Sequence, residues 1–145
     1  MTRLELRSAT PRDATAVASL LAELGYPVAE QDIPERLAAT VAEGGVVLLA
    51  VNDDGVPVGL MCLARHRVLH AVGPVAYITA LVVSAAARGL GVGRALVAAA
   101  LDWARTNDCV RLSVTSAEHR ADAHAFYPRC GMPYTGRRFS AAVTK

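Results

Sequence analysis

A strand that runs into a glycine-rich turn and then a helix constrains this chain more than any other feature. Residues Val75–Val83 are apolar and rich in β-branched side chains, without the clean alternation of a strand that has one exposed face. The segment Arg88–Arg94 follows with glycine at alternate positions, and beyond it apolar side chains recur at helical spacing over about residues 92–105. The three parts together predict a central strand, a tight turn and a helix of an α/β fold.

Hydrophobic periodicity predicts further elements on both sides of this unit. These are a strand near Leu4–Arg7, a helix from Pro11 to about Gly25, a short helix Ile33–Val41, a hairpin of Val46–Val51 and Val56–Leu63, a strand Val110–Thr115, a short helix Ala121–Arg129 and a closing strand Thr135–Val143. No linker, repeat or low-complexity tract divides the 145 residues. We therefore expect a single α/β domain over residues 1–145, with a mixed central sheet flanked by helices.

Charge and hydropathy exclude several classes of protein. Fifteen Lys and Arg against thirteen Asp and Glu leave a formal charge of +2, which is too weak to indicate nucleic acid as a partner. The longest apolar stretch is interrupted by polar residues and falls short of the roughly 20 residues that span a membrane. The N-terminus lacks the apolar core of a secretory signal, so we expect a cytoplasmic protein without a membrane partner.

The three cysteines do not suggest a metal or redox site. Cys62, Cys109 and Cys130 are odd in number and widely spaced, without a Cys-x-x-Cys pair. We expect buried free thiols that serve packing, and we expect no bound metal.

The glycine turn predicts a site for an anion. Glycine leaves backbone N–H groups free to face a ligand, and a helix start adds about half a positive charge. Arg88 and Arg94 bracket the turn and could pair with phosphate oxygens. A P-loop would end in Gly-Lys-Ser or Gly-Lys-Thr, and a dinucleotide fingerprint would need a glycine at the position of Arg94. What remains is the pattern Arg-x-x-Gly-x-Gly, filled by Arg88–Gly93.

This segment resembles the acyl-CoA-binding motif of the GCN5-related N-acetyltransferase (GNAT) superfamily. A later segment, Arg120–Met132, is similar to the family's helix pattern Asn-x-x-Ala-x-x-Phe/Leu-Tyr-x-x-x-Gly-Phe. Arg120 stands where the family usually has Asn, and Met132 replaces an aromatic residue. The order of elements along the chain also fits, so the resemblance implies a single-domain GNAT-like acyl-CoA N-acyltransferase fold.

The resemblance also implies roles for individual residues. Backbone groups of Leu81, Val82 and Val83 would hold the pantetheine arm of acetyl-CoA and place its thioester carbonyl. An acceptor amine would attack that carbonyl directly in a ternary complex, and Tyr127 would protonate the departing thiolate. The residues implied to hold the pyrophosphate, or to flank the amides that do, are Arg88, Gly89, Leu90, Gly91, Val92, Gly93 and Arg94. Each of these roles is carried by the resemblance.

The general base stays open, because the strand has no acidic residue near Thr79 or Ala80, where the family often has one. The candidates by chemistry are Glu23, His66, His70, Glu118 and His124, beside a chain of water molecules. More ordinary interpretations are an exposed position for His66 and His70, a packed or solvated one for His124 and a core position for Tyr127. Trp103 is expected in the core, and Arg137–Arg138 as a solvated pair.

Together these features predict an acetyl-CoA-dependent N-acetyltransferase that acts on a primary amine of a small molecule or peptide. A non-catalytic acyl-CoA-binding or regulatory module of the same fold is the alternative, and a nucleotide-binding protein is a third interpretation. In the family the acceptor pocket is shaped by segments that correspond here to Gly25–Arg36 and Tyr134–Ser140. A homodimer is an expectation that rests on the resemblance alone.

Overall fold

A computed structural model describes residues 3–115, 121–136 and 138–143. Its core is one sheet in the order β1-β2-β3-β4-β5. The strands are β1 (Glu5–Ser8), β2 (Val46–Val51), β3 (Pro57–His66), β4 (Val75–Val83) and β5 (Arg111–Val114). Neighbours from β1 to β4 are antiparallel, whereas β4 and β5 are parallel. This confirms the mixed sheet of an α/β fold.

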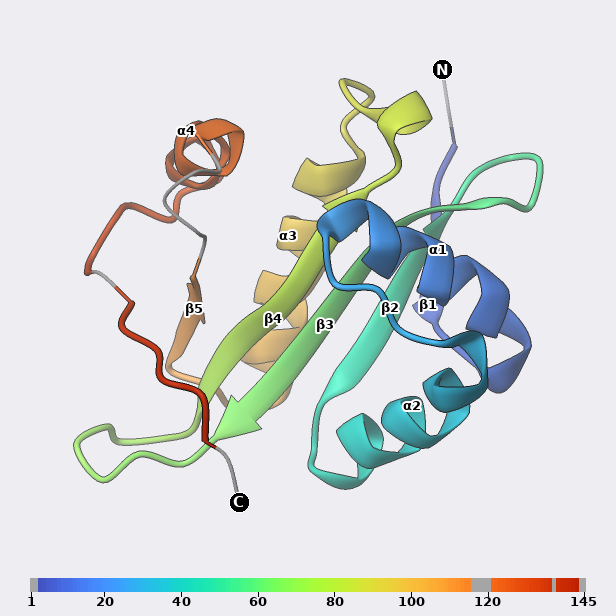
Figure 1. The fold of residues 1–145 in the computed structure, drawn as a ribbon. Coiled ribbons are helices and arrows are strands. Elements are labelled where there is room, and N and C mark those ends of the chain that lie inside the picture. Colours follow the sequence, from blue (N-terminus) through green and yellow to red (C-terminus); the bar gives the residue numbers. More distant parts are fainter. Residues whose placement is uncertain (1–2, 116–120, 137, 144–145) are drawn as a thin grey trace.

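Helices cover both faces of this sheet (Figure 1). The first two, α1 (Ala14–Leu24) and α2 (Ile33–Ala42), pack on one face, and α3 (Val92–Thr106) packs on the other. A fourth helix, α4 (Ala121–Arg129), lies beyond β5 and has the bounds that the sequence predicted. One-turn 3-10 helices, Pro11–Asp13, Glu30–Asp32 and Ala85–Ala87, occur before α1, α2 and α3.

The alternation of side chains along the strands separates the core into two clusters. Leu49 and Leu60 point to the face under α1 and α2, while their neighbours Ala50 and Met61 point to the face under α3. All four are fully buried. In α3 the buried stripe is Val92, Leu96, Val97, Ala100 and Ala104. Trp103, which was expected in the core, packs at its margin and is only partly buried.

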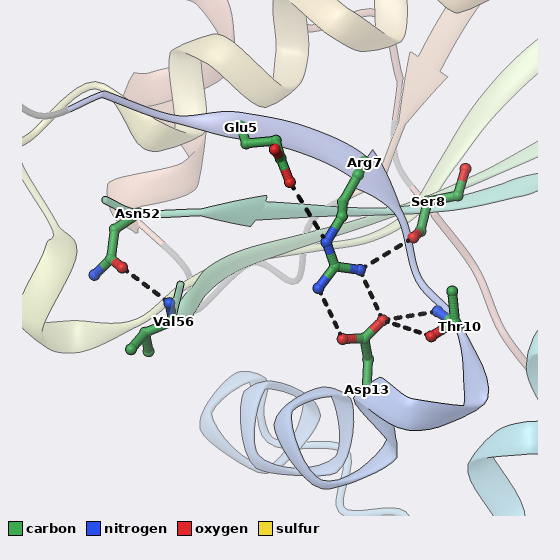
Figure 2. A network of polar contacts seen from close by, with 7 residues as sticks. All are labelled: Glu5, Arg7, Ser8, Thr10, Asp13, Asn52 and Val56. Atoms are coloured by element: carbon green, nitrogen blue, oxygen red, sulfur yellow. Dashed lines mark hydrogen bonds and ion pairs between the residues drawn. The ribbon is translucent and has the colours of Figure 1, made fainter. Parts of the chain in front are cut away.

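A charged network fixes the chain where β1 turns into α1 (Figure 2). The guanidinium of Arg7 donates to both oxygens of Asp13, with N–O distances of 2.9 Å. The same carboxylate accepts from the backbone N–H of Thr10 at 2.8 Å. These contacts lower the pKa of Asp13 to about 2, with the hydrogen bond from Arg7 as the largest cause.

The hairpin turn between β2 and β3 also forms where it was predicted. The side-chain oxygen of Asn52 accepts from the backbone N–H of Asp54 at 3.0 Å and of Val56 at 2.9 Å. Figure 2 shows the second of these bonds. An Asn side chain that replaces backbone acceptors in this way stabilises a tight turn.

The predicted closing strand Thr135–Val143 is wrong. Within it, the described residues 135–136 and 138–143 form no strand, and the sheet ends at β5 in the described part of the chain. The reason is burial: the side chains of Phe139 and Val143 are 89% and 96% exposed. A strand in such a sheet needs one face in the core, and this segment presents none.

The cysteines are free, as expected, but none of them is fully buried. Cys62 lies on β3 and packs against the cluster under α1 and α2. Desolvation raises the pKa of its thiol to about 11, which suits a packing role and not a reactive one.

Candidate active site

The two parallel strands separate before β4 ends. Their pairing runs from Val75 with Arg111 to Ile78 with Val114 and then stops, while β4 continues to Val83 against β3. From Thr79 to Val83 the edge of β4 that faces away from β3 therefore has no strand partner among the described residues. Backbone N–H and C=O groups on such an edge can pair with an extended ligand as they would with a strand.

The exposed edge leads directly into the glycine turn. Gly89 and Gly91 have φ angles of +80° and +83°, a left-handed conformation that favours glycine. A Cβ at either residue would meet no atom within 4 Å, so the outside of the turn is open. Gly91 directly precedes the first residue of α3.

The backbone donors of this turn have no partners among the described residues. No described acceptor bonds the amides of residues 89–94, and the first such bond in this stretch runs from Ala95 to Gly91 at 3.0 Å. A helix start leaves its first N–H groups unpaired and carries a partial positive charge. Six such amides can donate to the oxygens of a phosphate-containing ligand.

Charged side chains of both signs lie near the turn. Arg88 and Arg94 are both exposed, and the Nε of Arg88 donates to the carbonyl of Val83 at 3.4 Å. Leu90 and Val92 also line a cavity of about 360 Å³ together with Asp53 and Asp54. Because carboxylates repel phosphate, these two side chains oppose the attraction of the arginines and the amides for an anion.

Helix α4 packs against the first turn of α3 at Gly93. A Cβ at Gly93, in the first turn of α3, would lie 3.1 Å from Cζ of Phe126, which is tighter than ordinary contact. Close packing therefore favours glycine at this third position of the turn. The ring of Phe126 meets that of Tyr127 edge to face, with centroids 5.3 Å apart.

Tyr127 lines a second cavity, of about 290 Å³, where β4 and β5 diverge. Leu81, one of the predicted cofactor residues, lines it too, while the side chain of Val82 is buried under α1 and α2. Side chains of the strands, the end of α1, α4 and the C-terminal segment form its wall. They are Leu24, Tyr26, Tyr77, Ile78, Thr79, Ala80, Leu81, Val114, Thr115, Ala123, Tyr127 and Arg138.

None of the described candidate bases lines this cavity. His66, His70 and His124 are exposed and do not line it. The carboxylate of Glu23, at the end of α1, accepts from the backbone N–H of Ala85 at 3.0 Å and so holds the chain just after β4. Glu118 lies outside the described residues, as does Arg120, which stands at the family's usual Asn position.

The lining includes residues from both segments that the resemblance implied for the acceptor pocket: Tyr26 lies in Gly25–Arg36 and Arg138 in Tyr134–Ser140. Arg138 was individually expected as part of a solvated pair, and Tyr77 was not singled out for the site by the sequence. Arg138 is exposed, yet its side chain lies at the cavity and donates from Nη1 to the hydroxyl of Thr115 at 3.4 Å. Only tertiary contacts bring these residues together; Arg137 lies outside the described residues.

No helix among the described residues is long and apolar enough to cross a membrane. No group of three or more His, Cys, Asp or Glu side chains in the same part of the chain could hold a metal ion.

Comparison with known proteins identifies the family. Residues 14–132 match the model of the acetyltransferase (GNAT) family. An aminoglycoside N(6')-acetyltransferase type 1 of Stenotrophomonas maltophilia is 35% identical, over 91% of this chain and 88% of its own length. An aminoalkylphosphonate N-acetyltransferase of Salmonella typhimurium is 31% identical, over 96% of this chain and 91% of its own.

Solved structures agree with this result. A putative acetyltransferase from Agrobacterium tumefaciens is 28% identical, with a TM-score of 0.84 over 96% of this chain and 99% of its own. An aminoglycoside N-acetyltransferase in complex with CoA has a TM-score of 0.85 over 99% of this chain and 96% of its own. At 16% identity, that second likeness shows the fold alone. The chain therefore belongs to the acetyltransferase (GNAT) family of N-acetyltransferases.

Proposed function

We propose that this protein transfers the acetyl group of acetyl-CoA to a primary amine of a small molecule. The open edge of β4, followed by the six unpaired amides at residues 89–94, is the observation that carries the proposal. An extended arm that ends in a pyrophosphate fits this arrangement, since the strand edge binds the arm and the helix start binds the phosphates. The curated relatives, by their names, act on small-molecule amines.

In this proposal, residues at different positions bind the cofactor, orient its carbonyl and protonate the leaving group. Bound acetyl-CoA supplies a thioester carbonyl as the electrophile. Backbone groups of Leu81, Val82 and Val83 hold the pantetheine arm and orient that carbonyl in the cavity, while Arg88 and Arg94 add charge beside the amides. The amine attacks the carbonyl carbon, the carbon–sulfur bond breaks, and Tyr127 gives its phenolic proton to the thiolate.

The lining of the cavity bears on the removal of the amine's own protons. Among the described lining residues there is no carboxylate and no imidazole. We expect water to carry these protons: one leaves the ammonium to free the lone pair that attacks, a second leaves the nitrogen after the attack, and a proton returns to Tyr127. The missing carboxylate also favours the alternative, a module that binds acyl-CoA without turnover.

Calorimetric titration with acetyl-CoA tests the cofactor. We expect saturable binding at micromolar concentration, and an absence of heat at several hundred micromolar would exclude the assignment. Release of CoA thiol with a broad panel of amines separates an enzyme from a binding module, since a module binds acetyl-CoA and releases no thiol with any amine.

The role of Tyr127 is tested by Tyr127→Phe. We expect kcat to fall by about 100-fold with little change in the KM for acetyl-CoA, because the hydroxyl acts on the leaving group and not on cofactor binding. Tyr134→Phe is the matched control, since that side chain is 73% exposed and lies outside the cavity lining. A Tyr127→Phe variant with full turnover would remove the tyrosine from the mechanism.

A further inference from the structure

We propose that the acceptor is a small amine that also carries an anionic group, and that Arg138 binds this group. The inference rests on the proposed acetyl transfer and narrows its substrate class to amino acids and aminoalkyl phosphonates or phosphates. Polycationic amines such as aminoglycosides are excluded from the preferred class.

The described lining of the cavity carries a positive charge and no negative one. Arg138 is the one charged side chain among its described lining residues, which include no Asp or Glu. Four residues that carry hydroxyl groups, Tyr26, Tyr77, Thr79 and Thr115, line the same cavity. Because an ammonium-rich ligand needs carboxylates to replace its hydration, this lining disfavours a polycation and suits an oxyanion.

The guanidinium of Arg138 makes few contacts with the described residues. Within the described residues, its guanidinium has no carboxylate within the 4.0 Å of an ion pair, and the bond from Nη1 to the Thr115 hydroxyl is long, at 3.4 Å. By contrast, Arg7 on β1 donates from both of its terminal nitrogens to the carboxylate of Asp13. A guanidinium offers five N–H donors in a fork that matches carboxylate and phosphate oxygens. Most donors of Arg138 are therefore available to a ligand.

Arg138 lies near the point where β4 and β5 separate. Thr115 directly follows β5, and Thr79 lies on β4 directly after the last residue paired with β5. Arg138 thus stands where the strands separate, in the same cavity as Tyr127. At about 290 Å³ this cavity is at the small end of ligand pockets, which are typically about 300 to 1,000 Å³. A short acceptor can place its amine at the thioester and its anion at Arg138.

Four acceptors with the same two-carbon amine test the preference. We compare kcat/KM, by thiol release at saturating acetyl-CoA, for 2-aminoethylphosphonate, β-alanine, ethanolamine and ethylenediamine, with kanamycin as the polycation. We expect the better of the two anionic acceptors to exceed ethanolamine and ethylenediamine by at least about tenfold. The two anionic arms show whether phosphonate or carboxylate is preferred.

The arginine itself is tested by Arg138→Gln. We expect this variant to lose about 10- to 100-fold in kcat/KM for the anionic acceptors and to stay within about twofold for ethanolamine. Arg105→Gln is the matched control: Arg105 lies near the end of α3 and pairs with Asp102 at 3.1 Å, outside the cavity. A loss that is equal for charged and neutral acceptors would show a structural role and overturn the proposal.

A binding measurement separates failure of this inference from failure of the proposed function. The protein saturated with CoA is titrated with 2-aminoethylphosphonate and β-alanine, and then with ethanolamine. Tighter binding of an anionic amine, lost in Arg138→Gln, supports the inference even without turnover. Binding of ethylenediamine or kanamycin in preference to both anionic amines overturns it while the acetyl transfer stands, and a protein that binds no acetyl-CoA overturns both.

Discussion

Asp13 shows how one carboxylate joins two elements. Its side chain is only 10% exposed and is shared between Arg7 of β1 and Thr10 of the turn that precedes α1. Its place near the start of α1 is one where a negative charge favours the positive end of a helix. The ion pair with Arg7 could not be predicted from helix rules, because it depends on how β1 approaches the turn in the folded chain.

The lowered pKa of Asp13 makes a prediction about acid stability. Its folded value of about 2 lies below the ordinary 3.8, so the charged carboxylate stabilises the fold above about pH 4, and this contribution is lost as the pH falls towards 2. At pH 7 we expect Asp13→Asn to lower the free energy of unfolding by about 2 kcal/mol.

Urea denaturation from pH 7 to pH 2 measures both effects. The difference in unfolding free energy between the wild type and Asp13→Asn should shrink between about pH 4 and pH 2, because the wild type loses the same interaction there. A difference that stays constant over this range would show that the carboxylate has no lowered pKa.

Among the elements, α3 and α4 depend on one another at their contact. A Cβ at Gly93 would lie 3.1 Å from the ring of Phe126, and the neighbour of Phe126 is Tyr127. We therefore expect a side chain larger than alanine at Gly93 to displace α4 and with it the tyrosine hydroxyl. Sequence patterns predicted β4 and α4 at their observed bounds. Their contact is a tertiary property, which those patterns do not contain.

Substitution at Gly93 tests this contact. We expect Gly93→Val to lower kcat by about tenfold or more, because displacement of a reacting group by about 1 Å can cost up to 100-fold. Gly93→Ala should have a smaller effect, since the ring edge can shift by a few tenths of an ångström. In the double variant Gly93→Val with Phe126→Ala, partial recovery is expected; if the second substitution only adds to the damage, the contact is not the cause.

The C-terminal segment Thr135–Val143 differs from its predicted structure. It was expected to close the sheet as a strand, but the described residues there have exposed side chains and no ladder. Strand propensity depends on a face to bury, and that face is set by the other elements. Arg138 of this segment lines the cavity, as the resemblance implied for the region Tyr134–Ser140, although the residue itself was expected as part of a solvated pair.

For the whole molecule, the formal charge of +2 says little about the field at the glycine turn. Arg88, Arg94 and the start of α3 bring positive charge to the turn, while Asp53 and Asp54 line a cavity that borders it. Opposite charges that cancel in the total can still act separately on a ligand, because salt screens exposed charges over about 10 Å at 0.1 M.

The positive charge at the glycine turn predicts that cofactor binding depends on the salt concentration. We expect the Kd for acetyl-CoA to rise several-fold between about 0.05 and 0.5 M NaCl, since the screening length shortens over that range. Arg94→Gln should weaken binding at low salt and reduce the slope, whereas Arg105→Gln should leave both unchanged. Calorimetry at three salt concentrations measures the slope, and equal slopes in all three proteins would exclude Arg94 from the site.

The gap between β4 and β5 has one more consequence, which concerns solubility. Unpaired strand edges are templates on which chains associate, and proteins usually blunt or cover them. Here the edge of β4 from Thr79 to Val83 has no described strand partner. If an acyl-CoA occupies this edge, it also shields it, so the loaded protein should resist aggregation better than the empty one. The cosubstrate would then protect the chain that uses it.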